Sequence, residues 1–123
     1  MATTTMTEQN FEEIVDSHET VLIDFWAAWC GPCRSFAPTY EKVSEKYPDI
    51  VFAKVDTEAE QGLASSFNIM SIPTLMIIRE RVVLFSQAGA LPERALDELV
   101  EKIQLLDMAD VHRQVEQQRL AVD

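Results

Sequence analysis

Positive charge and long apolar stretches are both scarce in this chain of 123 residues. Ten Lys and Arg residues stand against 21 Asp and Glu residues, which gives a formal net charge of −11. Because binding to phosphates requires a basic surface, this balance argues against nucleic acid as a partner. No apolar run is long enough to span a bilayer, so we expect no membrane association.

A secretory signal is also missing from the N-terminal stretch "MATTTMTEQN", which has no basic region followed by an apolar segment. The expected location is therefore the cytoplasm, where structural disulfides are rare. The length and the 47% hydrophobic content predict one domain with one core.

Cysteine is scarce, since the chain has only Cys30 and Cys33. Gly31 and Pro32 lie between them. Structural zinc usually has four Cys or His ligands, and the two histidines of this chain are isolated, so we expect no metal. A structural disulfide would close a very short ring and remove little chain entropy. Thiol–disulfide exchange is the remaining and favoured interpretation.

The order of apolar runs predicts an α/β fold with helices on both faces of a sheet. Strands are expected at residues 21–26, 50–55, 74–79 and 82–87, with helices before the first of them, between the first three and after Pro92. Thr3 to Thr5 is either a brief first strand or a frayed end. The last two strands form a hairpin, which makes the sheet mixed.

Glycine is missing where that hairpin would use it, since only Glu80 and Arg81 separate the two strands. Tight hairpins favour Asn-Gly or Asp-Gly at the turn. We therefore expect a turn that is longer or looser than two residues.

Cys30 follows a buried strand and precedes a helix, so its sulfur is expected at the helix N-terminus. Unpaired N–H groups and the helix dipole stabilise a thiolate there. Pro32 suits the first turn, and Gly31 leaves the sulfur uncrowded. Cys33, one turn later, is expected to lie beneath Cys30 and to be more buried.

The motifs "DFWAAWCGPC", "SIPTLMI" and "AGAL" resemble the thioredoxin family, over roughly Thr3 to Leu106. The resemblance implies a thioredoxin fold, a central mixed β-sheet of four to five strands flanked by four helices. It also implies a cis peptide bond between Ile72 and Pro73. Residues 1–106 would form the thioredoxin domain, and residues 107–123 a C-terminal extension that is helical or frayed.

The same resemblance implies a protein-disulfide reductase that acts on client proteins through Cys30, the nucleophile, and Cys33, the resolving cysteine. No cofactor is expected beyond this redox-active pair, and electrons would come from NADPH through a thioredoxin reductase. Pro32 is typical of the reducing members, whereas oxidases and isomerases usually carry His there. We expect a monomer.

Asp24 interrupts an apolar strand, where a carboxylate is costly unless it is neutral or paired. It is either a structural buried acid or a functional one with a raised pKa. The resemblance makes Asp24 the proton carrier for Cys33, with Lys54 as its partner. The alternative for Lys54 is an ordinary strand lysine with its amine in solvent.

A client-binding surface is expected around the cysteines. Trp29 would form a flat contact, and Ile72, preceding cis-Pro73, would offer its backbone to an extended segment. Gly89 either permits close approach of a client or simply forms a turn. Gly31 and Pro32 complete the surface. Met70 stands where the family commonly has a polar or basic residue, and it would enlarge the apolar contact patch.

Two other functions compete with the reductase. One is a thioredoxin-fold binding or assembly subunit whose thiols are dispensable, which the C-terminal extension favours. The other is a thiol oxidase or isomerase, which Pro32 and the missing signal sequence disfavour.

Overall fold

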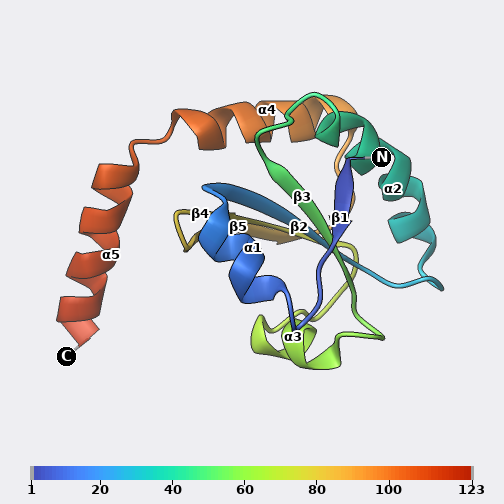
Figure 1. The fold of residues 1–123 in the computed structure, drawn as a ribbon, viewed down its shortest axis with the longest axis horizontal. Coiled ribbons are helices and arrows are strands. Elements are labelled where there is room, and N and C mark those ends of the chain that lie inside the picture. Colours follow the sequence, from blue (N-terminus) through green and yellow to red (C-terminus); the bar gives the residue numbers. More distant parts are fainter. Residues whose placement is uncertain (1, 123) are drawn as a thin grey trace.

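The computed structural model describes residues 2–122, which form five strands and five helices around one sheet (Figure 1). Met1 and Asp123, the outermost residues of the two predicted segments, lie outside this range. In chain order the elements are β1 (Thr3–Thr5), α1 (Phe11–Ser17), β2 (Thr20–Trp26), α2 (Gly31–Ser44), β3 (Val51–Asp56), α3 (Gln61–Ser66), β4 (Thr74–Arg79), β5 (Val82–Ala88), α4 (Glu93–Leu105) and α5 (Met108–Val122).

The sheet is mixed, with strand order β1-β3-β2-β4-β5 and β2 at its centre. Strand β3 is parallel to both β1 and β2, whereas β4 is antiparallel to β2 and β5. The parallel pair β2 and β3 requires a crossover, which α2 supplies. The predicted mixed sheet is confirmed, and Thr3–Thr5 is a strand and not a frayed end.

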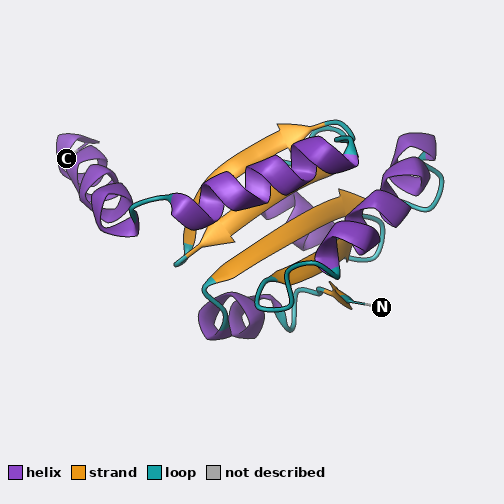
Figure 2. Cartoon of the chain, turned by 90° about the horizontal axis from the view of Figure 1, so that it is seen from above, coloured by secondary structure: helices purple, strands orange, loops and turns teal. Residues whose placement is uncertain are grey.

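Alternate residues of β2 belong to two hydrophobic cores, one on each face of the sheet. Leu22 packs with residues of α2 and α4, while Ile23 and Phe25 pack with residues of α1 and α3. This is the alternation that a pleated strand imposes. Figure 2 shows α4 crossing over the strands on one face.

The hairpin turn is tight, so the prediction of a longer or looser turn is wrong. Arg79 pairs with Val82, and Glu80 and Arg81 both have left-handed backbones, with φ of 50° and 68°. Each such residue costs about 1 kcal/mol. Two contacts offset that cost. The Glu80 N–H donates to Glu19 O at 2.8 Å, and Arg81 forms an ion pair with Asp16.

The predicted C-terminal extension is a separate helix, α5, which projects away from the sheet (Figure 1). The chain breaks between α4 and α5 because Leu106 is extended, with ψ of 140°. Met108 is buried, and His112 Nε2 lies 2.9 Å from Glu80 Oε1. The first turns of α5 thus contact the body of the protein, at the hairpin.

None of the helices described within residues 2–122 has the length and apolar character needed to cross a membrane.

Candidate active site

The two cysteines lie at the start of α2, directly after the loop that connects it to β2. Strand β2 ends at Trp26, and a short loop leads to Cys30, which is the N-cap residue of α2. Cys33 lies in the first turn of that helix, with its Cα 5.2 Å from that of Cys30, and the two sulfurs form a disulfide. Pro32 occupies the first turn, where a missing N–H costs no hydrogen bond.

The Cys30 sulfur is a hydrogen-bond acceptor. The backbone N–H of Cys33 donates to Cys30 Sγ at 3.2 Å, and the sulfur lies at the positive end of the α2 dipole. Both features stabilise a negative charge on this sulfur once the disulfide is reduced. The end of α2 therefore favours Cys30 as a thiolate.

Both cysteines are nearly buried, with exposed fractions of 5% for Cys30 and 4% for Cys33. The expected difference in burial is therefore absent in the disulfide form. Both sulfurs belong to one cluster with Ala27, against which Trp26 and Ile72 pack. The short ring holds the two sulfurs in the same layer, which accounts for their similar burial.

The bond between Ile72 and Pro73 is cis, as the resemblance implied. The Ile72 carbonyl oxygen lies 3.8 Å from Cys30 Sγ, so this segment borders the disulfide. Gly89 N donates to Pro73 O at 2.8 Å and has φ of 108°, a conformation that favours glycine. Gly89 lies at a bend directly after β5, and the space around its Cα is open.

Asp24 lies in the central strand β2, two residues before the end that leads to the cysteines, and is paired with Lys54 of β3 and Leu75 of β4. It is buried, and neither carboxylate oxygen has a hydrogen-bond partner within residues 2–122. Burial raises the pKa of Asp24 from 3.8 to about 6, although the charge of Lys54 works in the opposite direction. This carboxyl group therefore changes protonation close to neutral pH.

Lys54 lies beside Asp24 in the strand register, but its amine is directed to an aromatic ring. Lys54 Nζ is 5.2 Å from the centre of the Trp26 ring, a cation–π distance. The ion pairs found among the described residues do not include Lys54 with Asp24. Lys54 acts on Asp24 as a nearby charge and not as a hydrogen-bonded partner.

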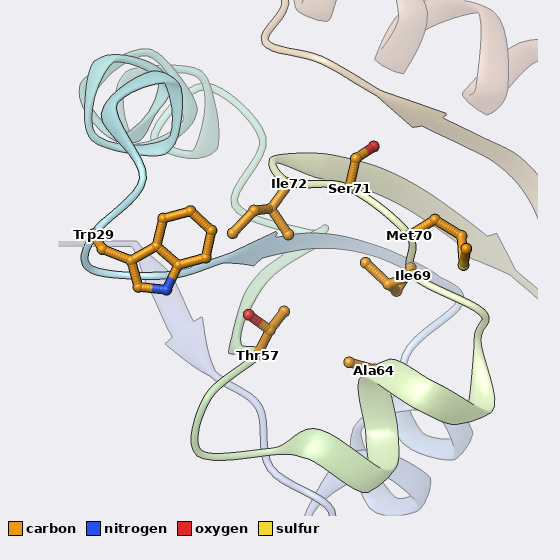
Figure 3. Close-up of a pocket in the computed structure, with 7 residues that line it drawn as sticks. All are labelled: Trp29, Thr57, Ala64, Ile69, Met70, Ser71 and Ile72. Atoms are coloured by element: carbon orange, nitrogen blue, oxygen red, sulfur yellow. The ribbon is translucent and has the colours of Figure 1, made fainter.

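A groove of about 420 Å³ is lined by Ile72, whose carbonyl oxygen lies 3.8 Å from Cys30 Sγ, and by Trp29, which precedes Cys30 in the chain. Figure 3 shows the residues that line it. Trp29 and Met70 lie on opposite sides of it, with exposed fractions of 68% and 92%. The full lining consists of Trp29, Thr57, Ala64, Ile69, Met70, Ser71 and Ile72. The structure thus brings predicted contact residues Trp29 and Ile72 together with Met70.

Sequence reasoning missed the lower part of this groove, which Thr57 and Ala64 form (Figure 3). A signal for Thr57 exists, because it directly follows β3 and parallel strands end at the same edge of a sheet. Thr57 N and Oγ1 both donate to Trp26 O, which fixes this edge next to the cysteine loop. Ala64 carries no such signal.

A redox-active cysteine pair at a helix N-terminus, on a mixed sheet with helices on both faces, defines a thiol–disulfide oxidoreductase. The family model described as thioredoxin matches residues 2–103. The chain belongs to the thioredoxin family. Members of this family carry electrons on the disulfide and need no prosthetic group. Among residues 2–122, no three His, Cys, Asp or Glu side chains are grouped as a metal site would require.

Individual relatives agree with this assignment. A putative thioredoxin 2 from Streptomyces coelicolor is 53% identical over 118 residues, which are 96% of this chain and 88% of that protein. The thioredoxin of Bacillus subtilis is 39% identical, over 83% of this chain and 98% of that protein.

Solved structures share the fold. A mutant thioredoxin from Halobacterium salinarum has a TM-score of 0.77 at 30% identity, covering 83% of this chain and 90% of that chain. The thioredoxin of Plasmodium falciparum has a TM-score of 0.74 at 36% identity, covering 80% and 96%. The partners of this chain are accordingly disulfide-containing client proteins and a reductase.

Proposed function

We propose that this chain reduces client disulfides, with Cys30 as the nucleophile. The Cys30 thiolate attacks a client disulfide, forms a mixed disulfide and releases the first client sulfur as a thiolate, which takes a proton from solvent. The observation that carries this proposal is the Cys33 N–H bonded to Cys30 Sγ at the start of α2. It favours the ionised form of Cys30, which is the attacking species.

Cys33 completes the reaction, and Asp24 accepts its proton. The Cys33 thiolate attacks Cys30, which restores the Cys30–Cys33 disulfide and releases the second client sulfur. Two electrons pass from the cysteine pair to the client. Two observations support the role of Asp24. Its pKa of about 6 leaves it mostly ionised at neutral pH. It also lies two residues after Leu22 in β2, so it faces the same side of the sheet as Leu22, the side that α2 covers.

Lys54 tunes Asp24 through its charge, which lowers the proton affinity of the carboxylate. The client segment lies along Trp29 and the backbone of Ile72, with cis-Pro73 setting the direction of that backbone. Gly31 and Pro32, which lie between the two cysteines, and Gly89, whose surroundings are open, complete the proposed client-binding surface. We further propose a cytoplasmic monomer that is recycled by a thioredoxin reductase and has neither nucleic acid nor a membrane as a partner.

A coupled assay tests the proposal. The chain, a thioredoxin reductase and NADPH are mixed with insulin, and NADPH oxidation is followed. We expect continuous oxidation that depends on both insulin and the chain. An oxidase would instead have a reduction potential of about −120 mV, and such a value would contradict the proposal.

A further inference from the structure

The groove beside the disulfide is continuous with the reacting sulfur through Ile72. The Ile72 carbonyl oxygen is 3.8 Å from Cys30 Sγ, and its side chain lines the groove (Figure 3). A client disulfide that reaches Cys30 therefore places the residue next to its cysteine at the groove. This inference rests on the proposed function, and it makes a segment of the client protein the occupant of the groove.

The groove is suited to an apolar side chain, since none of the described residues that line it is charged. The Thr57 hydroxyl already donates to Trp26 O at 3.0 Å. The Ser71 hydroxyl points away from Thr57 and Ala64 in Figure 3. A carboxylate of a client would lose hydration here without gaining a charged partner, which is costly.

Met70 extends the apolar lining of this groove. It is 92% exposed, although large apolar residues are usually packed against neighbours. It lies across the groove from Trp29, with Ile72 and Thr57 between them (Figure 3). A thioether is flexible and polarisable, adapts to different shapes and makes favourable contacts with aromatic rings.

We propose that Met70 is a specificity-determining residue, which selects clients carrying an aromatic or other large apolar side chain next to the reactive cysteine. Met70 closes over that side chain from the side opposite Trp29. It contributes to client recognition and takes no part in the exchange of sulfurs.

Two disulfide peptides that differ only in the residue beside one cysteine, Phe or Ser, test this proposal. Their reduction is followed by NADPH oxidation with a thioredoxin reductase, and kcat/KM is measured for each. Met70→Gln keeps the length of the side chain but makes its end polar. We expect the variant to lower kcat/KM for the Phe peptide roughly three- to tenfold and to leave the Ser peptide within about twofold.

Two variants serve as matched controls. Met70→Leu keeps an apolar side chain, and we expect it to retain most of the preference for the Phe peptide. Val83→Gln changes another exposed apolar residue, on β5 and outside the groove lining. We expect Val83→Gln to leave both peptides unchanged.

An unchanged ratio of the Phe to the Ser peptide in Met70→Gln would overturn the proposal. So would an equal loss in Met70→Leu or in Val83→Gln. Failure of the wild-type protein to reduce either peptide would instead overturn the proposed function itself, so the two failures are distinguishable.

Discussion

The two ends of the central sheet differ in how fully their buried polar groups are hydrogen-bonded. At the disulfide end, the oxygens of Asp24 have no hydrogen-bond partner within residues 2–122, and Trp29 and Met70 expose large apolar surfaces. At the hairpin end, Arg79 alone donates to Glu19 and to three carbonyl oxygens at the end of α4. Within residues 2–122, the buried side-chain N and O atoms that lack a hydrogen-bond partner are the two oxygens of Asp24.

This difference separates the groups that hold the fold from those that act on clients. A buried acid without partners lowers stability, yet it can exchange a proton near neutral pH. A paired arginine at a helix C-terminus raises stability instead, because it donates hydrogen bonds to the last carbonyl groups of the helix. It does not exchange a proton near neutral pH. Changes at the two ends should therefore affect different measurements.

Cysteine substitutions have the largest expected effect, and only on activity. Cys30→Ser should reduce insulin turnover to the rate of the reductase and insulin alone, since the nucleophile is gone. Cys33→Ser should keep the first attack and accumulate a mixed disulfide with insulin. Non-reducing gels of the two variants check this. A mixed disulfide that forms with Cys30→Ser and not with Cys33→Ser would reverse the two roles.

Asp24→Asn should separate stability from activity. The folded-state pKa of about 6 exceeds the ordinary 3.8, so the folded protein holds a proton that the unfolded chain releases. The resulting penalty is absent below pH 4, grows up to about pH 6 and is complete above it. It amounts to about 3 kcal/mol at pH 7. The variant should therefore be more stable by up to about that amount at pH 7 and equal to wild type at pH 4.

The same variant should resolve mixed disulfides more slowly than wild type above pH 6, because the proton acceptor is missing. Denaturant titrations at both pH values and single-turnover rates against pH measure the two effects. A lower denaturation midpoint than wild type at pH 7 would contradict the stability cost of Asp24. Identical rate profiles would contradict its role as proton acceptor.

Arg79→Ala should act at the opposite end and on stability alone. Its guanidinium is largely buried and donates to Ile103 O at 2.7 Å, so its loss uncovers carbonyl groups of α4. We expect a loss of about 2–3 kcal/mol in the free energy of unfolding. Arg94→Ala, which breaks only an exposed pair with Glu98, should cost less than about 0.5 kcal/mol. Equal losses in the two variants would show that Arg79 is not a structural anchor.

Truncation of α5 should lower stability less than Arg79→Ala does and should leave activity unchanged. A chain ending after Arg113 keeps buried Met108 and should match the full chain in stability within about 0.5 kcal/mol. A chain ending after Asp107 loses Met108 and should be less stable by about 1–2 kcal/mol. Both should reduce insulin normally, because α5 lies at the hairpin end. Lost activity in a folded truncated chain would instead give the extension a part in client or reductase binding.

The Streptomyces coelicolor relative matches 118 residues of this chain, and so its match necessarily includes most of α5. The family model, in contrast, ends at residue 103. The extension is thus an addition to the family domain that at least one relative shares.

Much of the fold was predictable because its signals are local. Strand β4 lies where its apolar run predicted it, from Thr74 to Arg79. The hairpin turn was not predictable from local preference. Glu80 and Arg81 are held in it by Glu19, Asp16 and His112, which are remote in the sequence.

The candidate active site was likewise predictable only in part. The cysteines, Pro32 and Asp24 stand out from residue type and position along the chain. The groove does not, because Ala64 and Thr57 join Trp29 only after β3 and α3 are placed beside the cysteine loop. The direction of the Lys54 amine toward Trp26 also depends on packing across two strands.

The most direct test of the central claim is the alkylation rate of the reduced protein with iodoacetamide at pH 7, with the modified residue identified by mass spectrometry. We expect Cys30 to react first and faster than a free model thiol, because the α2 N-terminus and the Cys33 N–H stabilise its thiolate. Labelling of Cys33 before Cys30, or no faster than the model thiol at either position, would contradict it.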